Sequence, residues 1–468
     1  MNAKSSDSVL IISQDILGRS MAGPGIRTYS LSQVLARHMR TLVASPRYDA
    51  TDLPPNGAEF HRFELGDWST LAPLVQQCSV CVAQGDIANI FPELADVDAA
   101  VVIDGYTPYL AEHLSTWAHL PVAEQISHWS LRLQILNRQY RVGDFFLCAS
   151  ERQRDWWLGL LEAHGRINPA TLADDPSLRR LLDVVPYGLR SEPIQRTQQV
   201  IRNVWPGIGD EDKVLLWGGG LWPWLDPLTA IRAVARLWAQ RQDLRLIFPG
   251  TRHPNPVVET MPTHTAAAKQ LAAELGLYDK AVFFGDWIPY ADWDNVLLES
   301  DLALSLHFDT LETRLAFRSR LFDYIRAGLP AIVSQGDATA EIIARHELGM
   351  VTPIADVEAV AAALAALLDE PRHTRAAAFE AARAQFTWEH AAEPLVRFCL
   401  NPYRAPDKAV LGEKFGNPVQ VALAEQLATA QKTIAAYEAG KFMRMMHALG
   451  QVRHRFLPAA QHDRTTPA

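Results

Sequence analysis

A stretch of the second half, residues 305–341, combines acidic and basic side chains in a pattern that suits an anionic ligand. Arg314 and Arg318 fall in the first turns of a helix expected to begin near Thr313, where the helix dipole disfavours cations. An anion bound at the same place would reverse that penalty. We therefore predict that Arg318 and Arg320 grip a phosphate group. The alternative is that these charges form ordinary surface pairs along one helix.

Four acidic residues of the same stretch are candidates for binding the rest of the ligand. They are Glu312, Asp323, Asp337 and Glu341. Carboxylates accept hydrogen bonds from hydroxyl groups, so a ligand that carries both a phosphate and a sugar would suit this set. For Asp323 the alternative is a side chain that merely faces solvent.

The elements that position these residues follow from the spacing of apolar side chains. Apolar residues recur every three or four positions from Leu315 to Ile325, as on the buried face of a helix. Gly328 and Pro330 end that helix. The next apolar run, Ala331–Ser334, is typical of a buried parallel strand. In an open α/β sheet, ligands bind beyond the carboxyl ends of the strands, which is where this helix begins.

The arrangement resembles the nucleotide-sugar site of retaining GT-B glycosyltransferases, particularly glycosyltransferase family 4. That family has a Glu after a strand, a second acidic residue one helix later, and then a small residue, Gly, an apolar residue and Pro before a buried strand. Glu312, Asp323 and the turn Ala327–Pro330 match in order. The resemblance implies that Asp323 binds ribose hydroxyls and that Glu312, the catalytic candidate, lies near the transferred sugar. The two acids are farther apart here than is usual in the family, and the second is Asp where Glu is usual.

A glycine turn follows the first strand of the second half. In the resembled family the equivalent loop supplies an Arg and a Lys to the donor diphosphate, but residues 217–227 contain no basic side chain. We expect Arg318 and Arg320 to take over the phosphate charge, with backbone amides of Gly219 and Gly220 as further donors. The alternative is that the protein binds no nucleotide diphosphate.

The first half contains candidates for the other side of the site. Gly23, Gly25 and Arg27 follow the first strand, and glycine lets the backbone approach a ligand closely. Most such turns only connect elements, but the resembled family places the equivalent loop over the donor and acceptor sugars. Asp104 follows another strand, and His113 lies in the helix after it. A turn-forming Asp104 and an exposed or capping His113 are the alternatives.

Strands and helices alternate through both halves, as in doubly wound parallel sheets. We predict an α/β protein of GT-B architecture, with two Rossmann-like domains facing a cleft. The domains are 1–195, on the acceptor side, and 213–400, on the nucleotide-sugar side, joined by a linker at 196–212. A helical extension with a disordered end follows at 401–468. Its apolar stripe and basic residues at 418–456 are candidates for contact with a partner protein or an anionic membrane surface.

Composition narrows the class of function. The 468 residues carry a net charge of -9, which argues against general nucleic-acid binding. No apolar run is long enough for a signal peptide or a membrane span, so we expect the cytoplasm, or a peripheral place at the inner membrane surface. Cys78 and Cys81 lie in one apparent strand and are expected to be structural. No metal or other cofactor is expected, because arginine side chains can stabilise the negative charge of the phosphate groups.

The resemblance implies a hexosyltransferase-type enzyme of polysaccharide biosynthesis that moves a sugar from a nucleotide-sugar to a glycan, lipid-linked or small-molecule acceptor, with retention. No general base can be named from the sequence. In the resembled family the leaving phosphate is thought to assist the acceptor. Two other functions remain open: a non-catalytic GT-B scaffold in polysaccharide assembly, and a GT-B sugar-nucleotide epimerase or hydrolase.

Overall fold

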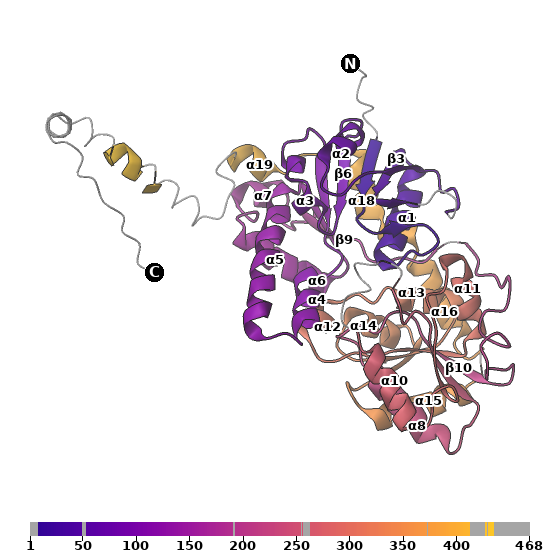
Figure 1. Ribbon diagram of the computed structural model, residues 1–468. Helices are drawn as coiled ribbons and strands as arrows, with labels where there is room; N and C mark the ends of the chain where they lie inside the picture. The colour runs from indigo at the N-terminus through magenta and orange to yellow at the C-terminus, as the bar shows by residue number, and fades with distance from the viewer. Residues whose placement is uncertain are drawn as a thin grey trace, which may run out of the picture.

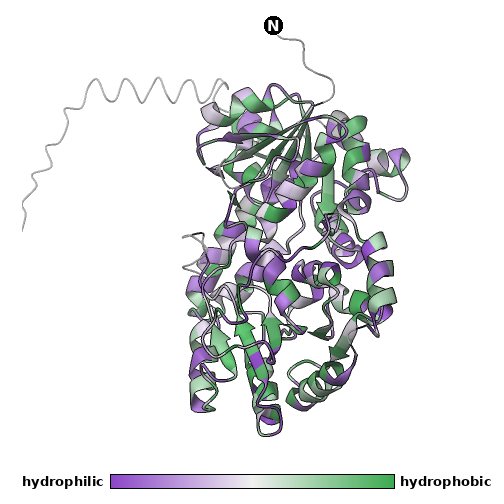
Figure 2. Ribbon diagram, turned by 90° about the vertical axis from the view of Figure 1, so that its right-hand side faces the viewer, coloured by the Kyte–Doolittle hydropathy of each residue, from purple (hydrophilic) through white to green (hydrophobic). Residues whose placement is uncertain are grey.

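The protein consists of two lobes, seen one above the other in the computed structural model (Figure 1). The structure describes residues 8–48, 53–190, 192–253, 255, 263–371, 373–411, 426–427 and 429–434. Figure 2 shows that the strands in both lobes are strongly hydrophobic, whereas the surrounding helices carry polar and apolar residues. This is the pattern of sheets buried between layers of amphipathic helices.

The first lobe contains, among the described residues, a seven-stranded sheet in the order β5-β3-β1-β6-β7-β8-β9. Its strands are β1 (Ser8–Ile12), β3 (Arg40–Ser45), β5 (Glu59–Arg62), β6 (Val80–Gln84), β7 (Ala100–Asp104), β8 (Phe145–Cys148) and β9 (Leu182–Val184). All pair in parallel, and Val9 of β1 lies opposite Thr41 on one side and Val80 on the other. The strand order reverses between β1 and β6, and such a switch point is where open α/β sheets bind ligands.

The second lobe repeats this plan, with a six-stranded parallel sheet in the order β12-β11-β10-β13-β14-β15 among the described residues. Its strands are β10 (Lys213–Trp217), β11 (Leu244–Phe248), β12 (Val282–Phe284), β13 (Leu302–Ser305), β14 (Ala331–Ser334) and β15 (Gly349–Thr352). The switch point lies between β10 and β13, where Trp217 pairs with Leu304. The predicted α/β class with two doubly wound parallel sheets is therefore confirmed.

Helices cover both faces of each sheet. In the first lobe they are α1 (Gly23–Ala36), α2 (Trp68–Val75), α3 (Ile87–Ile90), α4 (Tyr109–Trp117), α5 (Val122–Val142), α6 (Glu151–Ala163) and α7 (Pro169–Asp174). In the second they are α8 (Pro227–Trp238), α10 (Thr265–Glu274), α11 (Trp293–Glu299), α12 (Leu311–Leu315), α13 (Arg320–Ala327), α14 (Ala338–Arg345), α15 (Val357–Asp369) and α16 (Ala376–Gln385). Ser150 caps α6 and Asp226 caps α8, each accepting a hydrogen bond from a backbone amide of the first turn.

One predicted helix, 313–325, is two helices in the structure. Ala316 has an extended backbone, with φ -68° and ψ 151°, which ends α12 before α13 begins. Glu312 therefore lies in a short helix and not in a turn, and Arg318 lies in the connection between two helices. Gly328 ends α13 in the left-handed conformation, with φ 67°, as its place before Pro330 suggested.

The chain returns to the first lobe after α16. The returning helices are α17 (Trp388–Ala391), α18 (Glu393–Leu400) and α19 (Pro406–Leu411). Phe398 stacks on Phe145 of β8 at 4.8 Å between ring centroids. Asp407 of α19 forms a buried ion pair with Arg166 at 2.7 Å. The second lobe is thus connected to the first at both of its ends.

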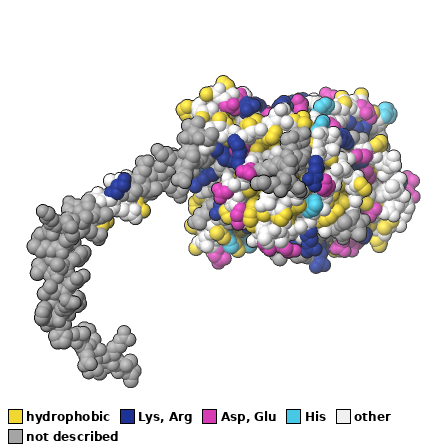
Figure 3. Space-filling view, turned by 90° about the horizontal axis from the view of Figure 1, so that it is seen from above, with side chains coloured by type: hydrophobic (Ala, Val, Ile, Leu, Met, Phe, Trp, Pro, Cys, Tyr) yellow, Lys and Arg dark blue, Asp and Glu magenta, His cyan; other side chains and the backbone are white. Residues whose placement is uncertain are grey.

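The predicted contact segment 418–456 lies largely outside the described residues. Residues 426–427 and 429–434 are helical, and the side chains of Leu427 and Ile434 are exposed. Every helix that the structure describes is too short or too polar to cross a bilayer. On the face seen in Figure 3, basic and acidic side chains are interspersed. Cys78 and Cys81 are buried, unlinked thiols, and no group of His, Cys, Asp and Glu side chains in the described ranges could hold a metal ion.

Candidate functional site between the two domains

A cavity of about 610 Å³ lies between the two lobes, at the carboxyl ends of both sheets. Gln84 and Gly85 line it at the end of β6, and Gly218–Gly220 line it at the end of β10. The cavity therefore touches both switch points. Its volume falls within the range of about 300–1,000 Å³ that is usual for small-molecule sites. We take this cavity as the candidate site.

Arg320 lies against the glycine turn of the second lobe. A Cβ atom at Gly219 would lie 3.0 Å from Cζ of Arg320, and Gly219 has φ +137°, a conformation that side chains rarely allow. Nη1 of Arg320 is buried without a hydrogen-bond partner among the described residues. Burial lowers the pKa of Arg320 below its ordinary value. A cation in this position suits an anionic ligand, because no carboxylate among the described residues forms an ion pair with it.

Arg318 also lines the cavity, but its charge is already balanced. Its Nη1 and Nη2 donate to the two carboxylate oxygens of Glu312 at 2.7 and 2.8 Å. Its Nε lies 3.4 Å from a carboxylate oxygen of Asp337. Glu312 is 1% exposed and held by this fork. The two arginines that we predicted to act together are therefore not equivalent, and Arg320 is the one that forms no ion pair in the described part of the chain.

Asp323 lines the cavity from the first turn of α13. Its Oδ2 accepts a hydrogen bond from the indole of Trp293 at 3.1 Å, and the other oxygen is not engaged in that bond. Burial raises the pKa of Asp323 above its ordinary value. The residue predicted to bind ribose hydroxyls is thus at the cavity, where a carboxylate can accept hydrogen bonds from a ligand.

Asp337 and Glu341 do not line the cavity, contrary to the prediction that they contact the ligand. Asp337 is the N-cap of α14 and accepts a hydrogen bond from the amide of Ala340 at 2.6 Å. Glu341 has a 56% exposed side chain and pairs with Arg152 of the other lobe at 2.5 Å. The first carboxylate is used by a helix start and the second by a surface ion pair.

Arg27 is likewise not a cavity residue. It is fully buried and forms a two-bonded ion pair with Asp104, at 2.8 and 2.9 Å. Its remaining donors bond the carbonyl oxygens of Val185 and Pro186. Asp104 adjoins the cavity, but its carboxylate is occupied by Arg27. The pair ties α1 to the end of β7, so Arg27 has a structural role in place of the predicted ligand contact, whereas Asp104 lies at the cavity as predicted.

The predicted glycine turn of the first lobe is the first turn of α1. Gly23 lines the cavity, and a Cβ there would lie 3.5 Å from the hydroxyl of Ser319 in the other lobe. Gly25 does not line it. A Cβ at Gly25 would lie 2.4 Å from the carbonyl oxygen of Ile16, so glycine is needed there for α1 to pack on the strand β2 (Ile16–Leu17).

His113 lines the cavity from α4, in agreement with its predicted side. Its ring lies between Tyr109, at 4.4 Å, and Trp117, at 5.0 Å between centroids. Burial lowers the pKa of His113 to about 4, so the imidazole is neutral at physiological pH. Nε2 has no hydrogen-bond partner in the part of the chain that the structure describes.

Glu112 is a cavity residue that sequence reasoning missed. It projects from α4, and burial together with the nearby charge of Glu312 raises its pKa to about 8. The two glutamates come from different lobes, and Arg318 adds an attraction that acts in the opposite direction on the pKa. No motif marks Glu112 in the sequence. Its one signal is that it adjoins His113.

Aromatic rings line the cavity on the side of the second lobe. Trp222 and Trp224 stack at 5.8 Å with an angle of 17° between their planes, and both line the cavity. His253 packs edge-on against Trp287 at 4.9 Å. Flat aromatic surfaces of this kind suit a nucleobase or the apolar face of a sugar.

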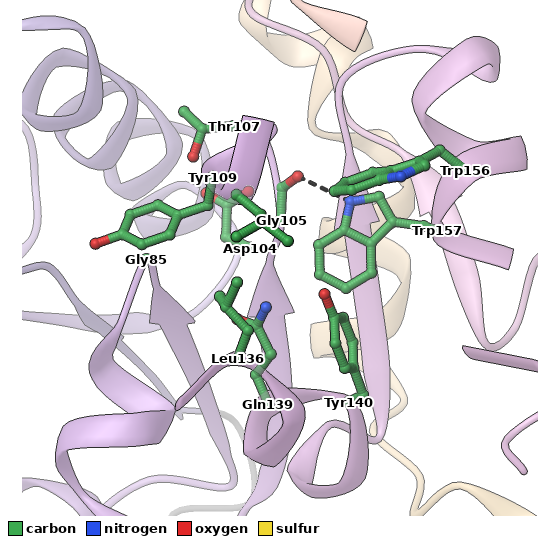
Figure 4. A pocket seen from close by; sticks show the side chains of 11 residues that line it. Gly85, Asp104, Gly105, Thr107, Tyr109, Leu136, Gln139, Tyr140, Trp156 and Trp157 are labelled. Carbon is green, nitrogen blue, oxygen red and sulfur yellow. Dashed lines mark hydrogen bonds between the residues drawn. The ribbon is translucent and has the colours of Figure 1, made fainter. Parts of the chain in front are cut away.

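A much smaller pocket, of about 20 Å³, lies in the first lobe beside the main cavity and shares Gly85, Asp104 and Tyr109 with it. Figure 4 shows Trp157 packed against Gly105, with its indole donating to the carbonyl of Gly105 at 3.1 Å. A Cβ at Gly105 would lie 2.0 Å from that ring. The pocket has room for about one water molecule, so it is not a second ligand site. Trp157, which lines it, holds the loop after β7 through Gly105.

Two doubly wound domains with a cavity between their switch points define the GT-B architecture. Residues 205–385 match the model of a family described as glycosyl transferases group 1. The match covers most of the second lobe and includes Glu312, Arg318, Arg320 and Asp323. A search among curated proteins gives no match.

Solved structures extend the likeness over both lobes. WaaG, a glycosyltransferase involved in lipopolysaccharide biosynthesis, is 16% identical with a TM-score of 0.56, over 84% of this chain and 100% of that one. HepE from Anabaena, in complex with UDP-glucose, is 16% identical with a TM-score of 0.56, over 85% and 100%. Sucrose-phosphate synthase from Thermosynechococcus elongatus is 15% identical with a TM-score of 0.55, over 84% and 98%. The predicted resemblance to group 1 glycosyltransferases and the GT-B fold is therefore confirmed.

Proposed function

We propose that the protein transfers a hexosyl group from a nucleotide-sugar to an acceptor hydroxyl, with retention of the anomeric configuration. The observation that carries the proposal is Arg320 at the second switch point, a guanidinium in contact with Gly219 whose buried Nη1 has no hydrogen-bond partner among the described residues. It supplies a positive charge at the loop where residues 217–227 contain no basic side chain. The complex of HepE with UDP-glucose supports a nucleotide-sugar as the donor.

The cavity offers a place for each part of such a donor. The diphosphate lies beside Arg320 and the turn at Gly219 and Gly220. The ribose hydroxyls donate to Asp323, and the base lies over Trp222. The sugar then points toward the first lobe, where Glu112 and His113 line the cavity. The donor is thus held by the second lobe and presented to an acceptor on the first.

The chemistry requires charge stabilisation more than a nucleophile. The bond from the anomeric carbon to the phosphate oxygen breaks, the acceptor oxygen bonds to the same face of that carbon, and a phosphate oxygen takes the acceptor's proton. Arg320 stabilises the charge that develops on the leaving diphosphate. Glu312 holds Arg318 through two bonds, so it acts here by fixing that guanidinium. Guanidinium groups supply the positive charge in this scheme, and no metal ion is invoked.

The acceptor belongs to the first lobe in this proposal. A glycan, a lipid-linked sugar or a small hydroxylated molecule would fit the role, and the reaction would take place in the cytoplasm or at the inner membrane surface as a step of polysaccharide biosynthesis. The scaffold and the epimerase or hydrolase remain the competing functions. They differ from the transferase in whether a donor binds and in whether its turnover needs an acceptor.

The decisive experiment measures binding of UDP-, GDP-, ADP- and dTDP-sugars by thermal shift and calorimetry. We expect one of them to bind, and Arg320→Ala to weaken that binding by about 10- to 100-fold, as the loss of a charge-assisted hydrogen bond of about 1.5–3 kcal/mol implies. The matched control is Arg314→Ala, an exposed arginine of α12 outside the cavity.

Three results would change the conclusion. Failure of every nucleotide-sugar to bind would favour the scaffold. Donor turnover without acceptor, at a rate that added acceptors do not alter, would favour the epimerase or hydrolase. Equal affinity of the wild type and Arg320→Ala would refute the phosphate assignment.

A further inference from the structure

Gln153 of the first lobe is bonded to both lobes at the edge of the cavity. Its amide nitrogen donates to the carbonyl oxygens of Tyr106, at 2.9 Å, and Leu315, at 2.7 Å. Tyr106 follows β7 in the first lobe, and Leu315 is the last residue of α12 in the second. Its amide oxygen accepts from the amide of Ala149 at 2.7 Å. This network fixes the orientation of the amide, since the reverse would direct an oxygen at two carbonyls.

The neighbouring Arg152 extends the contact at the surface. Its guanidinium donates to the carbonyl oxygens of Arg314, at 3.2 Å, and Gly336, and pairs with Glu341. Figure 1 shows α6, α4, α12 and α14 gathered where the two lobes meet. Exposed pairs such as this one contribute little energy each. Gln153, which is 0% exposed, is therefore the stronger part of the contact.

The segments held by α6 carry Glu312 and Arg318, which line the cavity, and Asp337, which lies beside Arg318. Leu315 stands midway between Glu312 and Arg318 in the chain, and Gly336 precedes Asp337. The last carbonyls of a short helix have no partner within it. The carbonyl of Leu315 obtains its donor from the other lobe. The place of the α12–α13 connection thus depends on how the lobes sit together.

We propose that Gln153 is a positioning residue that couples the approach of the two lobes to the placement of Glu312 and Arg318. If the lobes separate, the carbonyl of Leu315 loses its buried donor, and an unsatisfied buried carbonyl costs free energy. A donor that needs Glu312 and Arg318 in place then favours the closed arrangement, and closure favours the donor. The ligand in this inference rests on the proposed function, whereas the coupling between the lobes does not.

The test compares Gln153→Met with Arg154→Met. Methionine keeps the length of the glutamine side chain and removes both its donor to the two lobes and its acceptor for the amide of Ala149. Arg154 also donates to two carbonyl oxygens, those of Leu182 and Ser177, but both lie in the first lobe. Hydrogen exchange of the ligand-free proteins should be faster at residues 311–319 in Gln153→Met and unchanged there in Arg154→Met. Wild-type exchange at 311–319 in Gln153→Met would overturn the proposal.

A second measurement separates positioning from simple loss of stability. The ligand is whichever of UDP-, GDP-, ADP- and dTDP-glucose binds the wild type. We expect about tenfold weaker binding to Gln153→Met (about 1.4 kcal/mol) and unchanged binding to Arg154→Met. Equal weakening in both variants would assign Gln153 a merely structural role. If none of the four binds the wild type, the donor is none of these glucose nucleotides, and the exchange result alone still decides the role of Gln153.

Discussion

At the scale of single residues, the site is organised by which charges are already paired. Arg318 is held between Glu312 and Asp337, whereas Arg320 has no acidic partner among the residues that the structure describes. Two arginines two positions apart therefore have different chemistry, because only one can offer its full charge to a ligand. Glu112 adds a carboxyl group from the other lobe, placed where burial and Glu312 both oppose its ionisation.

Glu112→Gln is expected to change how stability depends on pH. The pKa of Glu112 rises from 4.5 to about 8 in the folded protein, so the folded state keeps a proton that the unfolded chain has released. Its contribution to stability is present below pH 4.5 and is lost as pH rises through about 8. Glutamine cannot ionise. The melting temperature of the variant relative to that of the wild type should therefore increase as the pH is raised from 5 to 9.

Glu124→Gln, at an exposed position of α5, is the control for that experiment. It should follow the wild-type curve over the whole range. A difference between Glu112→Gln and the wild type that stays constant from pH 5 to 9 would contradict the assigned burial of this carboxyl group.

At the scale of elements, a fully buried charge pair helps to anchor the helices that return to the first lobe. Nε of Arg166 lies 2.7 Å from Asp407 of α19, and both side chains are 0% exposed. Arg166 also donates to the carbonyl of Tyr140 at 2.6 Å. The pair joins α19 to the region between α6 and α7, which are far from it in the sequence. Such a contact fixes the place of an element and does not by itself add much stability.

Asp407→Ala should be strongly destabilising, because it leaves the guanidinium of Arg166 buried without its counter-charge. We expect a loss of about 3–5 kcal/mol in the free energy of unfolding, measured in urea. The double variant Arg166→Met with Asp407→Ala should recover most of that loss, since it buries no charge. Equal destabilisation by the single and double variants would mean that packing, and not charge, holds α19.

At the scale of the whole molecule, the two lobes are linked by polar contacts near the chain crossings. Asp294 of α11 accepts hydrogen bonds from Arg190, at 2.5 Å, and from Arg326 of α13, at 2.7 and 2.9 Å. Burial opposes the ionisation of Asp294, but the guanidinium groups of Arg326 and Arg190 hold its pKa below the ordinary value. Arg190 leaves the first lobe, so one carboxylate ties the end of that lobe to two helices of the other.

Asp294→Ala is expected to uncouple the unfolding of the lobes. Two partly buried guanidinium groups lose their shared partner, at a cost of about 2–5 kcal/mol. Calorimetry should then resolve two unfolding transitions in the variant, whereas the wild type should unfold in a single, narrower transition. Asp292→Ala, which removes a bond to Gln198 close by, serves as the control and should leave the transition unchanged in width. An unaltered profile in Asp294→Ala would show that other contacts carry the coupling.

Much of the fold could be predicted from the sequence because its signals are local. Apolar runs such as Ala331–Ser334 mark strands that are buried on both faces, and Gly328 marks a helix end. Glycine turns after the first strand of each lobe marked both sides of the cavity. The break between α12 and α13 was missed, since the apolar spacing continues across Ala316 with a helical period.

The sequence by itself determined two doubly wound sheets and several of the chain segments that line the site, because period, turn chemistry and strand burial are properties of neighbouring residues. Only the tertiary structure decided which charged side chains are paired with other groups of the protein. Arg27 meets Asp104 across 77 positions of sequence, and Gln153 meets Leu315 across 162. Partners at such distances are chosen by how the layers and lobes pack, and that packing leaves Arg320 as a buried cation available to a ligand.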